Sequence, residues 1–126
     1  MTDLKGLDSF SRVAPPALPS PALPSPVIEE TNDALQCPRC GEISGLHHCA
    51  VQVQERDQED GPGTQVYVGN GAVKVTRTSG DHYGTRRNAV RVGFWCEHCD
   101  EDATPRVVLV IRQHKGLTLV MWEAAR

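Results

Sequence analysis

The sequence has few aromatic residues and no long hydrophobic run. Phe, Trp and Tyr together make up 5% of the 126 residues. No stretch of 18 consecutive apolar residues occurs, so we expect no membrane-spanning helix. The first residues lack the basic region and the continuous apolar stretch of a secretory signal, which favours a cytoplasmic location.

Motifs of the common catalytic sites are also missing. The sequence contains no Gly-rich phosphate-binding loop, no His-Glu-x-x-His motif and no Gly-x-Ser-x-Gly nucleophile elbow. A chain of this size leaves little room for a deep substrate cavity. We therefore expect a protein that binds a partner, and not an enzyme with a small-molecule substrate.

The excess of negative charge lies near the N-terminus. The net charge is −3, and residues 1–36 hold five acidic and two basic residues, which leaves 11 of each in residues 37–126. A protein that binds nucleic acid through overall positive charge would be basic. Any such binding must here depend on a local patch.

Proline is concentrated in one segment. Six of the nine prolines lie in residues 15–26, where Ala-Leu-Pro-Ser-Pro occurs twice in succession. Proline fixes φ and has no amide hydrogen, so this segment favours extended conformations over helix or sheet. We predict a disordered Pro-rich arm over residues 1–36 and a single small domain over residues 37–126.

From Leu46 onward, hydrophobic residues alternate with polar ones. Asn70-Gly71 and Lys115-Gly116 lie between such alternating runs and indicate hairpin turns. No segment shows convincing helical periodicity. The predicted class is all-β, a small antiparallel sheet of about six strands, at residues 46–54, 65–68, 72–78, 89–95, 106–112 and 117–122.

Two details of this pattern bear on packing. The alternation places Cys49 on the same face as Val51 and Val53, where a free cysteine is typically a small buried hydrophobic residue and not a nucleophile. Residues 107–111 are apolar on both faces, which is typical of a central strand covered on both sides. In so small a domain, the second face must be covered by a β-meander inserted earlier in the chain or by another subunit.

Four of the five cysteines form two Cys-x-x-Cys pairs. Cys37 and Cys40 are separated from Cys96 and Cys99 by 55 residues. Two tight turns of this kind can direct four thiolates at one tetrahedral zinc ion. Disulfides would need an oxidising compartment, and a redox-active pair would need a βαβ context. A single iron ion remains an alternative.

Histidines near these pairs are weaker candidates for ligands. His47 or His48 could replace one of the cysteines, whereas we expect His98, inside the second pair, to point away from the metal. The four cysteines are therefore the predicted ligand set.

The Cys-x-x-Cys-Gly sequence at residues 37–41 resembles the knuckle of zinc-ribbon proteins, and the β-rich remainder is similar to that family. The spacer is longer than in compact ribbons, and Asp100 stands where a glycine often follows the second pair. Similar small zinc-ribbon proteins occur among uncharacterised bacterial and bacteriophage proteins. The resemblance implies a closed, structural Zn²⁺ site, with the long spacer as an inserted β-meander.

Residues 71–91 carry a local excess of basic charge. An Arg-rich hairpin with an aromatic residue at its tip can contact phosphates and stack on a base. The candidate nucleic-acid-binding residues are Lys74, Arg77, Tyr83, Arg86, Arg87 and Arg91.

These features predict a small zinc-binding protein that acts as a nucleic-acid-binding module. The alternative is a protein-interaction or assembly module, including self-association, that uses the C-terminal hairpin and the N-terminal arm.

Overall fold

The protein is an all-β structure. The computed structural model describes residues 23–56, 61–78 and 88–125. These residues form eight strands and no helix, so none of them provides a helix that could cross a membrane. The strands are β1 (Ile28–Glu29), β2 (Ala34–Leu35), β3 (Leu46–Arg56), β4 (Gly63–Gly69), β5 (Ala72–Thr78), β6 (Ala89–Cys96), β7 (Val107–His114) and β8 (Leu117–Ala124).

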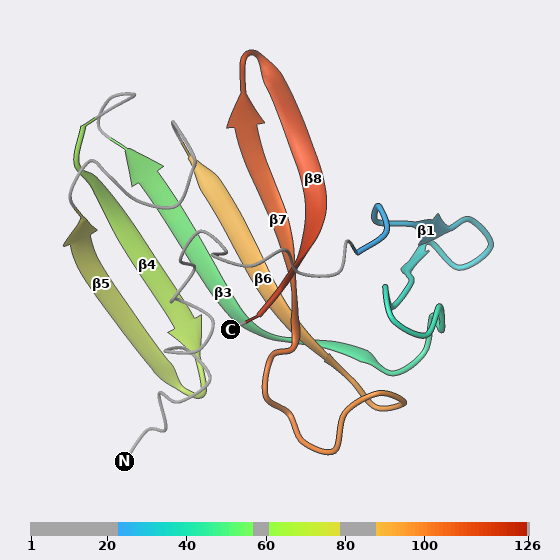
Figure 1. The fold of residues 1–126 in the computed structure, drawn as a ribbon. Helices are drawn as coiled ribbons and strands as arrows, with labels where there is room; N and C mark the ends of the chain where they lie inside the picture. Colours follow the sequence, from blue (N-terminus) through green and yellow to red (C-terminus); the bar gives the residue numbers. More distant parts are fainter. Residues whose placement is uncertain (1–22, 57–60, 79–87, 126) are drawn as a thin grey trace.

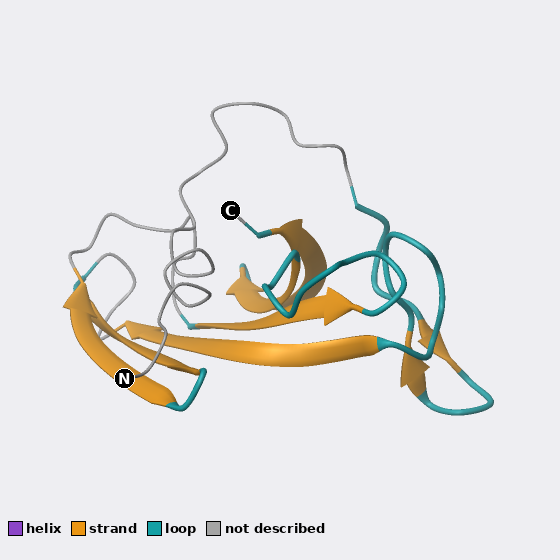
Figure 2. Ribbon diagram, turned by 90° about the horizontal axis from the view of Figure 1, so that it is seen from below, coloured by secondary structure: helices purple, strands orange, loops and turns teal. Residues whose placement is uncertain are grey.

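Six of these strands form one antiparallel sheet, as predicted. Their order is β5-β4-β3-β6-β7-β8, so two three-stranded meanders meet where β3 pairs with β6. Strands β5 and β8 are the two edges, and the sheet is strongly bent (Figures 1 and 2). The remaining strands, β1 and β2, form a separate two-stranded sheet beside one end of the larger one (Figure 1).

Two tight turns define the hairpins of the large sheet. Asn70 and Gly71 join β4 to β5 with φ angles of 51° and 75°, and Lys115 and Gly116 join β7 to β8 with φ angles of 50° and 80°. Two successive positive φ angles characterise the turn whose twist matches that of the adjoining strands. Both predicted hairpins are confirmed.

The last part of the predicted arm has regular structure. Ile28 pairs with Leu35 across β1 and β2, and the carboxylate of Glu29 accepts hydrogen bonds from the amides of Thr31 and Asn32, each at 2.9 Å. These bonds satisfy the turn amides within the hairpin itself. Ordered structure therefore begins before the first cysteine, while residues 1–22 of the predicted arm lie outside the described residues.

The structure buries the opposite face of the sheet to the one that the sequence predicts. Gln52 and Gln54 on β3 are fully buried, whereas Val53 between them is 42% exposed. The register changes between His48 and Ala50, which marks a β-bulge at Cys49. Beyond this bulge, the glutamine side of β3 lies on the buried face.

The buried face combines a small apolar core with a polar network. Ala50, Tyr67, Val108 and Val110 form the core cluster. Beside it, the Tyr67 hydroxyl donates to Gln65, Gln52 donates to the Tyr67 hydroxyl at 3.5 Å, and Gln65 donates to Gln54 at 3.5 Å. These side-chain bonds explain how neighbouring strands can carry glutamines on a buried face.

The second half of strand β7 is covered on one face rather than two. Val108 and Val110 are buried, but Ile111 is 37% exposed, and β7 lies next to the edge strand β8. The prediction of a central strand covered on both sides is therefore wrong for the second half of β7. The apolar residues on its other face belong to a larger exposed surface described below.

Candidate metal centre

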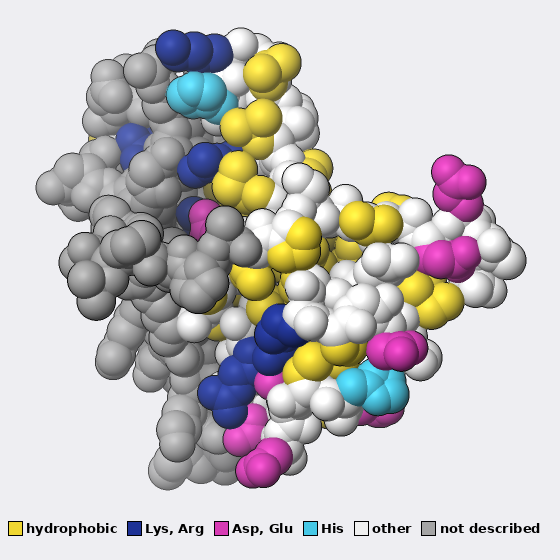
Figure 3. Space-filling model, turned by 45° about the vertical axis from the view of Figure 1, so that its right-hand side comes forward, with side chains coloured by type: hydrophobic (Ala, Val, Ile, Leu, Met, Phe, Trp, Pro, Cys, Tyr) yellow, Lys and Arg dark blue, Asp and Glu magenta, His cyan; other side chains and the backbone are white. Residues whose placement is uncertain are grey.

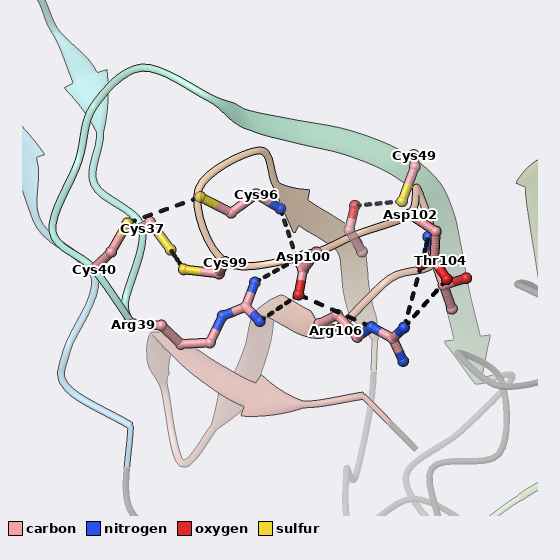
Figure 4. Close-up of polar contacts among 11 residues, drawn as sticks. Cys37, Arg39, Cys40, Cys49, Cys96, Cys99, Asp100, Asp102, Thr104 and Arg106 are labelled. Carbon is pink, nitrogen blue, oxygen red and sulfur yellow. Dashed lines mark hydrogen bonds and ion pairs between the residues drawn. The ribbon is translucent and has the colours of Figure 1, made fainter.

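Four sulfur atoms converge where the start of the described chain meets the end of β6. The Sγ atoms of Cys37 and Cys99 are 4.0 Å apart, those of Cys40 and Cys96 are 3.8 Å apart, and all four lie within 4.8 Å of one another (Figure 4). A disulfide would require about 2.05 Å. Four thiolates arranged tetrahedrally at about 2.3 Å from one metal ion lie about 3.8 Å apart. The cluster therefore matches a four-cysteine metal site.

The first pair of cysteines lies in a turn closed by backbone hydrogen bonds. The amide of Gly41 donates to the carbonyl of Cys37 at 2.9 Å, and the amide of Cys37 donates to the carbonyl of Glu42 at 3.0 Å. Gly41 has a φ of 78°, a left-handed conformation that glycine adopts without steric cost. The glycine that the sequence singles out after this pair therefore closes the turn.

The second pair is closed in a different way. The amide of Asp100 donates to the carbonyl of Cys96 at 2.9 Å, and its carboxylate accepts a hydrogen bond from the amide of Cys96 at 2.8 Å. Asp100 is not among the residues with a positive φ. The carboxylate thus fixes this turn at the position that Gly41 occupies after the first pair.

Asp100 also joins the two turns. Its carboxylate oxygens accept hydrogen bonds from the two terminal nitrogens of Arg39, each at 2.7 Å (Figure 4). Such bidentate pairs combine charge with fixed geometry, and the Asp100 side chain is only 5% exposed. Arg106 approaches the same carboxylate at 4.0 Å and donates to Asp102 at 3.2 Å. Arg39 and Asp100 therefore connect the first knuckle to the second beside the sulfur atoms.

The thiols differ in their acidity because their surroundings differ. At Cys37, burial alone would raise the pKa, but hydrogen bonds from the amides of Arg39 and Cys40 outweigh it and lower the pKa to about 7. Burial, together with the neighbouring sulfur atoms, raises the pKa of Cys96 and raises the pKa of Cys99 to about 12. Four adjacent sulfur atoms resist simultaneous ionisation unless a cation compensates their charge. A divalent metal ion supplies that compensation.

The nearby histidines point away from the sulfur atoms. The Nε2 atom of His98 lies 2.8 Å from the carbonyl oxygen of Ser44, and His47 stacks on Trp95 at 4.5 Å with its Nε2 atom 2.8 Å from Glu97. His48 makes an edge contact with Phe94. The cluster therefore consists of cysteines alone, and His98 points outward as the sequence predicts.

Cys49 is separate from this cluster. It lies in the β-bulge of β3, and its thiol donates to the carbonyl of Gly93 at 3.5 Å (Figure 4). Burial raises the pKa of this thiol to about 11. A thiol that stays protonated at neutral pH is a poor nucleophile, which agrees with the packing role expected for Cys49.

The predicted nucleic-acid-binding residues do not form one patch in the described part of the chain. Lys74 and Arg77 lie on opposite faces of β5, because they pair with Tyr67 and Thr64 respectively. Arg91 is only 1% exposed, in contrast to the surface position that phosphate binding requires. Tyr83, Arg86 and Arg87 lie outside the described residues. On the side drawn in Figure 3, acidic and basic side chains are interspersed near the lower edge.

The bond between Arg39 and Asp100 is the functional feature that the sequence analysis missed. Asp100 attracts attention in the sequence as a departure from a glycine position, and Arg39 lies between the first two cysteines. Opposite charges directly beside a cysteine in each of the two knuckles could have indicated a pair. The two residues are 61 positions apart in the chain, so their contact can be recognised only when the two knuckles are known to lie side by side.

Comparison with known proteins gives no further indication of a family. No protein-family model, no curated protein and no solved structure matches the chain. The function must therefore be inferred from the geometry of the site and of the sheet.

Proposed function

We propose that the protein is a zinc-ribbon-like binding module in which Cys37, Cys40, Cys96 and Cys99 hold one structural Zn²⁺ ion. The spacing of the sulfur atoms, 3.8 and 4.0 Å for the two closest pairs across the knuckles, carries this proposal. Zinc prefers four-coordinate thiolate sites of this kind, and an all-cysteine site is typical of structural zinc. Iron in the same four thiolates is the competing assignment.

The ion would act by holding the fold together. Four protein ligands complete a tetrahedral shell, which leaves no position for water or substrate. Structural zinc contributes about 10–16 kcal/mol of apparent binding energy in small zinc-dependent peptides, and this energy is coupled to folding. We therefore propose a protein without enzymatic activity, in which the metal fixes the two knuckles and the sheet presents the binding surface.

A protein-interaction or assembly role has more support than nucleic-acid binding. Val73 and Val75 on β5 are 68% and 63% exposed, and an exposed aliphatic surface of this kind is typical of an interaction site. For nucleic-acid binding, the described residues offer Lys74 and Arg77 on opposite faces of one strand. Binding of generic DNA or RNA that weakens steeply with salt would favour the nucleic-acid role instead.

The metal site is tested by native mass spectrometry combined with elemental analysis. Protein purified without added metal should carry one zinc ion per chain and release it on denaturation. Cys96→Ser should lose the ion and the folded state, because one of the four ligands is removed. Cys49→Ala, the matched control at a cysteine outside the cluster, should keep both. Equal loss in the two variants, or iron in place of zinc, would contradict the proposal.

A further inference from the structure

The outer side of the six-stranded sheet carries a largely aliphatic surface, with the rings of Phe94 and Trp122 in contact at one end. Alternate residues on neighbouring strands bring it together: Val51 pairs with Val68 and Val92, and Val66 pairs with Val75. We call this surface the valine face. Its members are Val51, Val53, Val66, Val68, Val73, Val75, Val90, Val92, Leu109, Ile111 and Val120.

The valine face is open in the single chain. Besides the two valines of β5, Val120, Val68 and Val53 are 49%, 47% and 42% exposed, and they lie on β8, β4 and β3 respectively. The exposure therefore extends from one edge strand of the sheet to the other. Complete burial of one such side chain contributes about 1.5–3 kcal/mol, so a surface of this extent favours a partner strongly.

The size of the valine face suits a sheet-on-sheet interface. Six strands about 4.8 Å apart, each at least seven residues long at about 3.3 Å per residue, cover roughly 29 by 23 Å, or about 650 Å², before any loss to the bend of the sheet. Two such faces in contact bury up to about 1,300 Å² in total, at the lower end of the range of about 1,200–2,000 Å² for specific stable interfaces. One face packed on an equal face therefore reaches the area that a stable dimer needs.

The chemistry of the face favours a second copy over other occupants. Among the described residues on this side of the six strands, the charged ones are Glu55 and Arg77, at the ends of β3 and β5. Interfaces of homodimers are more apolar than those between independent proteins, which keep a larger polar share. An anionic membrane surface would need a basic rim, and the chain has a net charge of −3.

We propose that two copies of this chain pack their valine faces together as a two-fold symmetric β-sandwich dimer. This inference deepens the proposed assembly role by naming its partner. In a two-fold interface the same surface faces itself, and an aliphatic face is complementary to its own copy. The two sheets would stack about 10 Å apart, with β3 and β6 at the centre and the edge strands at the rim.

The test is the oligomeric state of the full metal-loaded chain, measured by sedimentation velocity over a range of concentrations. We expect a dimer for the natural sequence. Val75→Lys should weaken dimerisation by at least roughly 10-fold, because it removes an apolar contact from each copy and places an ammonium group against the partner's aliphatic side chains at the rim. In the single chain position 75 is 63% exposed, so the variant monomer should remain folded.

Leu117→Lys is the matched control. Leu117 is 60% exposed, close to Val75, but it lies on the other side of the sheet, since it pairs with His114. This variant should dimerise like the natural chain. A monomeric natural chain, a dimeric Val75→Lys variant, or association into open-ended larger species would overturn the proposal.

The metal content of each sample separates this proposal from the preceding one. If the natural chain is a monomer with one zinc ion per chain, the dimer is refuted and the metal site is supported. If the natural chain is a dimer without bound metal, and Val75→Lys dissociates it, the valine face is supported and the zinc site is refuted.

Discussion

Asp100 takes the place of a glycine in the second knuckle and also connects the two knuckles. Its carboxylate closes the second knuckle through the amide of Cys96 and reaches the guanidinium of Arg39 in the first. Hydrogen bonds to Arg39 above all, and then to the Cys96 amide, hold the pKa of this carboxyl below its usual value. The side chain thus remains charged at the pH at which thiolates bind a metal.

Loss of this carboxylate should loosen the metal centre. In Asp100→Ala, the Cys96 amide and the Arg39 guanidinium both lose their acceptor, and we expect a loss of about 1–3 kcal/mol in the free energy of unfolding. Urea denaturation of the metal-loaded protein measures this change, and transfer of the metal to a chelator should be faster. Asp102→Ala is the control, because Asp102 is 58% exposed. Equal stability of the two variants would show that the hydrogen bonds of the Asp100 carboxylate do not stabilise the protein.

The metal ligands and their separation from Cys49 could be predicted from the sequence at the residue scale. Cys-x-x-Cys spacing is local, so it reports directly on the turn that it forms. The contact between Arg39 and Asp100 could not be predicted in the same way, because it joins two knuckles that are far apart in the chain.

At the scale of the strands, the hairpins followed from the sequence and the burial of the faces did not. Alternation identifies which residues share a face, and Val51 and Val53 do share one. Alternation does not indicate which of the two faces is buried within a single chain. The sequence favoured burial of the valines, whereas the structure buries Gln52 and Gln54 through side-chain hydrogen bonds.

The two hairpin turns differ in one position, which gives a paired prediction. Asn70-Gly71 and Lys115-Gly116 adopt similar backbone angles, but asparagine tolerates a positive φ better than lysine. Lys115→Asn should therefore stabilise the protein by about 0.5–1 kcal/mol, and Asn70→Lys should destabilise it by a similar amount. Thermal or chemical denaturation measures both. Changes of the same sign would contradict this account of the turns.

At the scale of the whole molecule, the metal centre and the apolar core lie in different places. The core cluster joins β3, β4 and β7, whereas the cysteines lie at the end of β6 and in the segment before β3. A small sheet of this size has little stability to spare, so a metal ion held by the four cysteines would have a disproportionate effect on that end of the molecule.

Removal of the ion should therefore loosen the molecule unevenly. On addition of a chelator, amide hydrogen exchange should accelerate most in residues 36–45 and 96–100, and least in β4 and β7. Exchange followed by mass spectrometry locates the change along the chain. Uniform acceleration over all strands would show that the metal centre and the core unfold as one unit.

The small sheet of β1 and β2 pairs only within itself among the described strands and lies outside the six-stranded sheet. The chain from this hairpin to Gly45 meets the second knuckle through the sulfur cluster, the Arg39–Asp100 pair and contacts from Ser44 and Gly45. Without a bound metal ion, residues 36–45 would become a tether between the hairpin and β3 with a mean span of about 17 Å. Metal availability would then set how far anything attached to the hairpin can travel from the sheet.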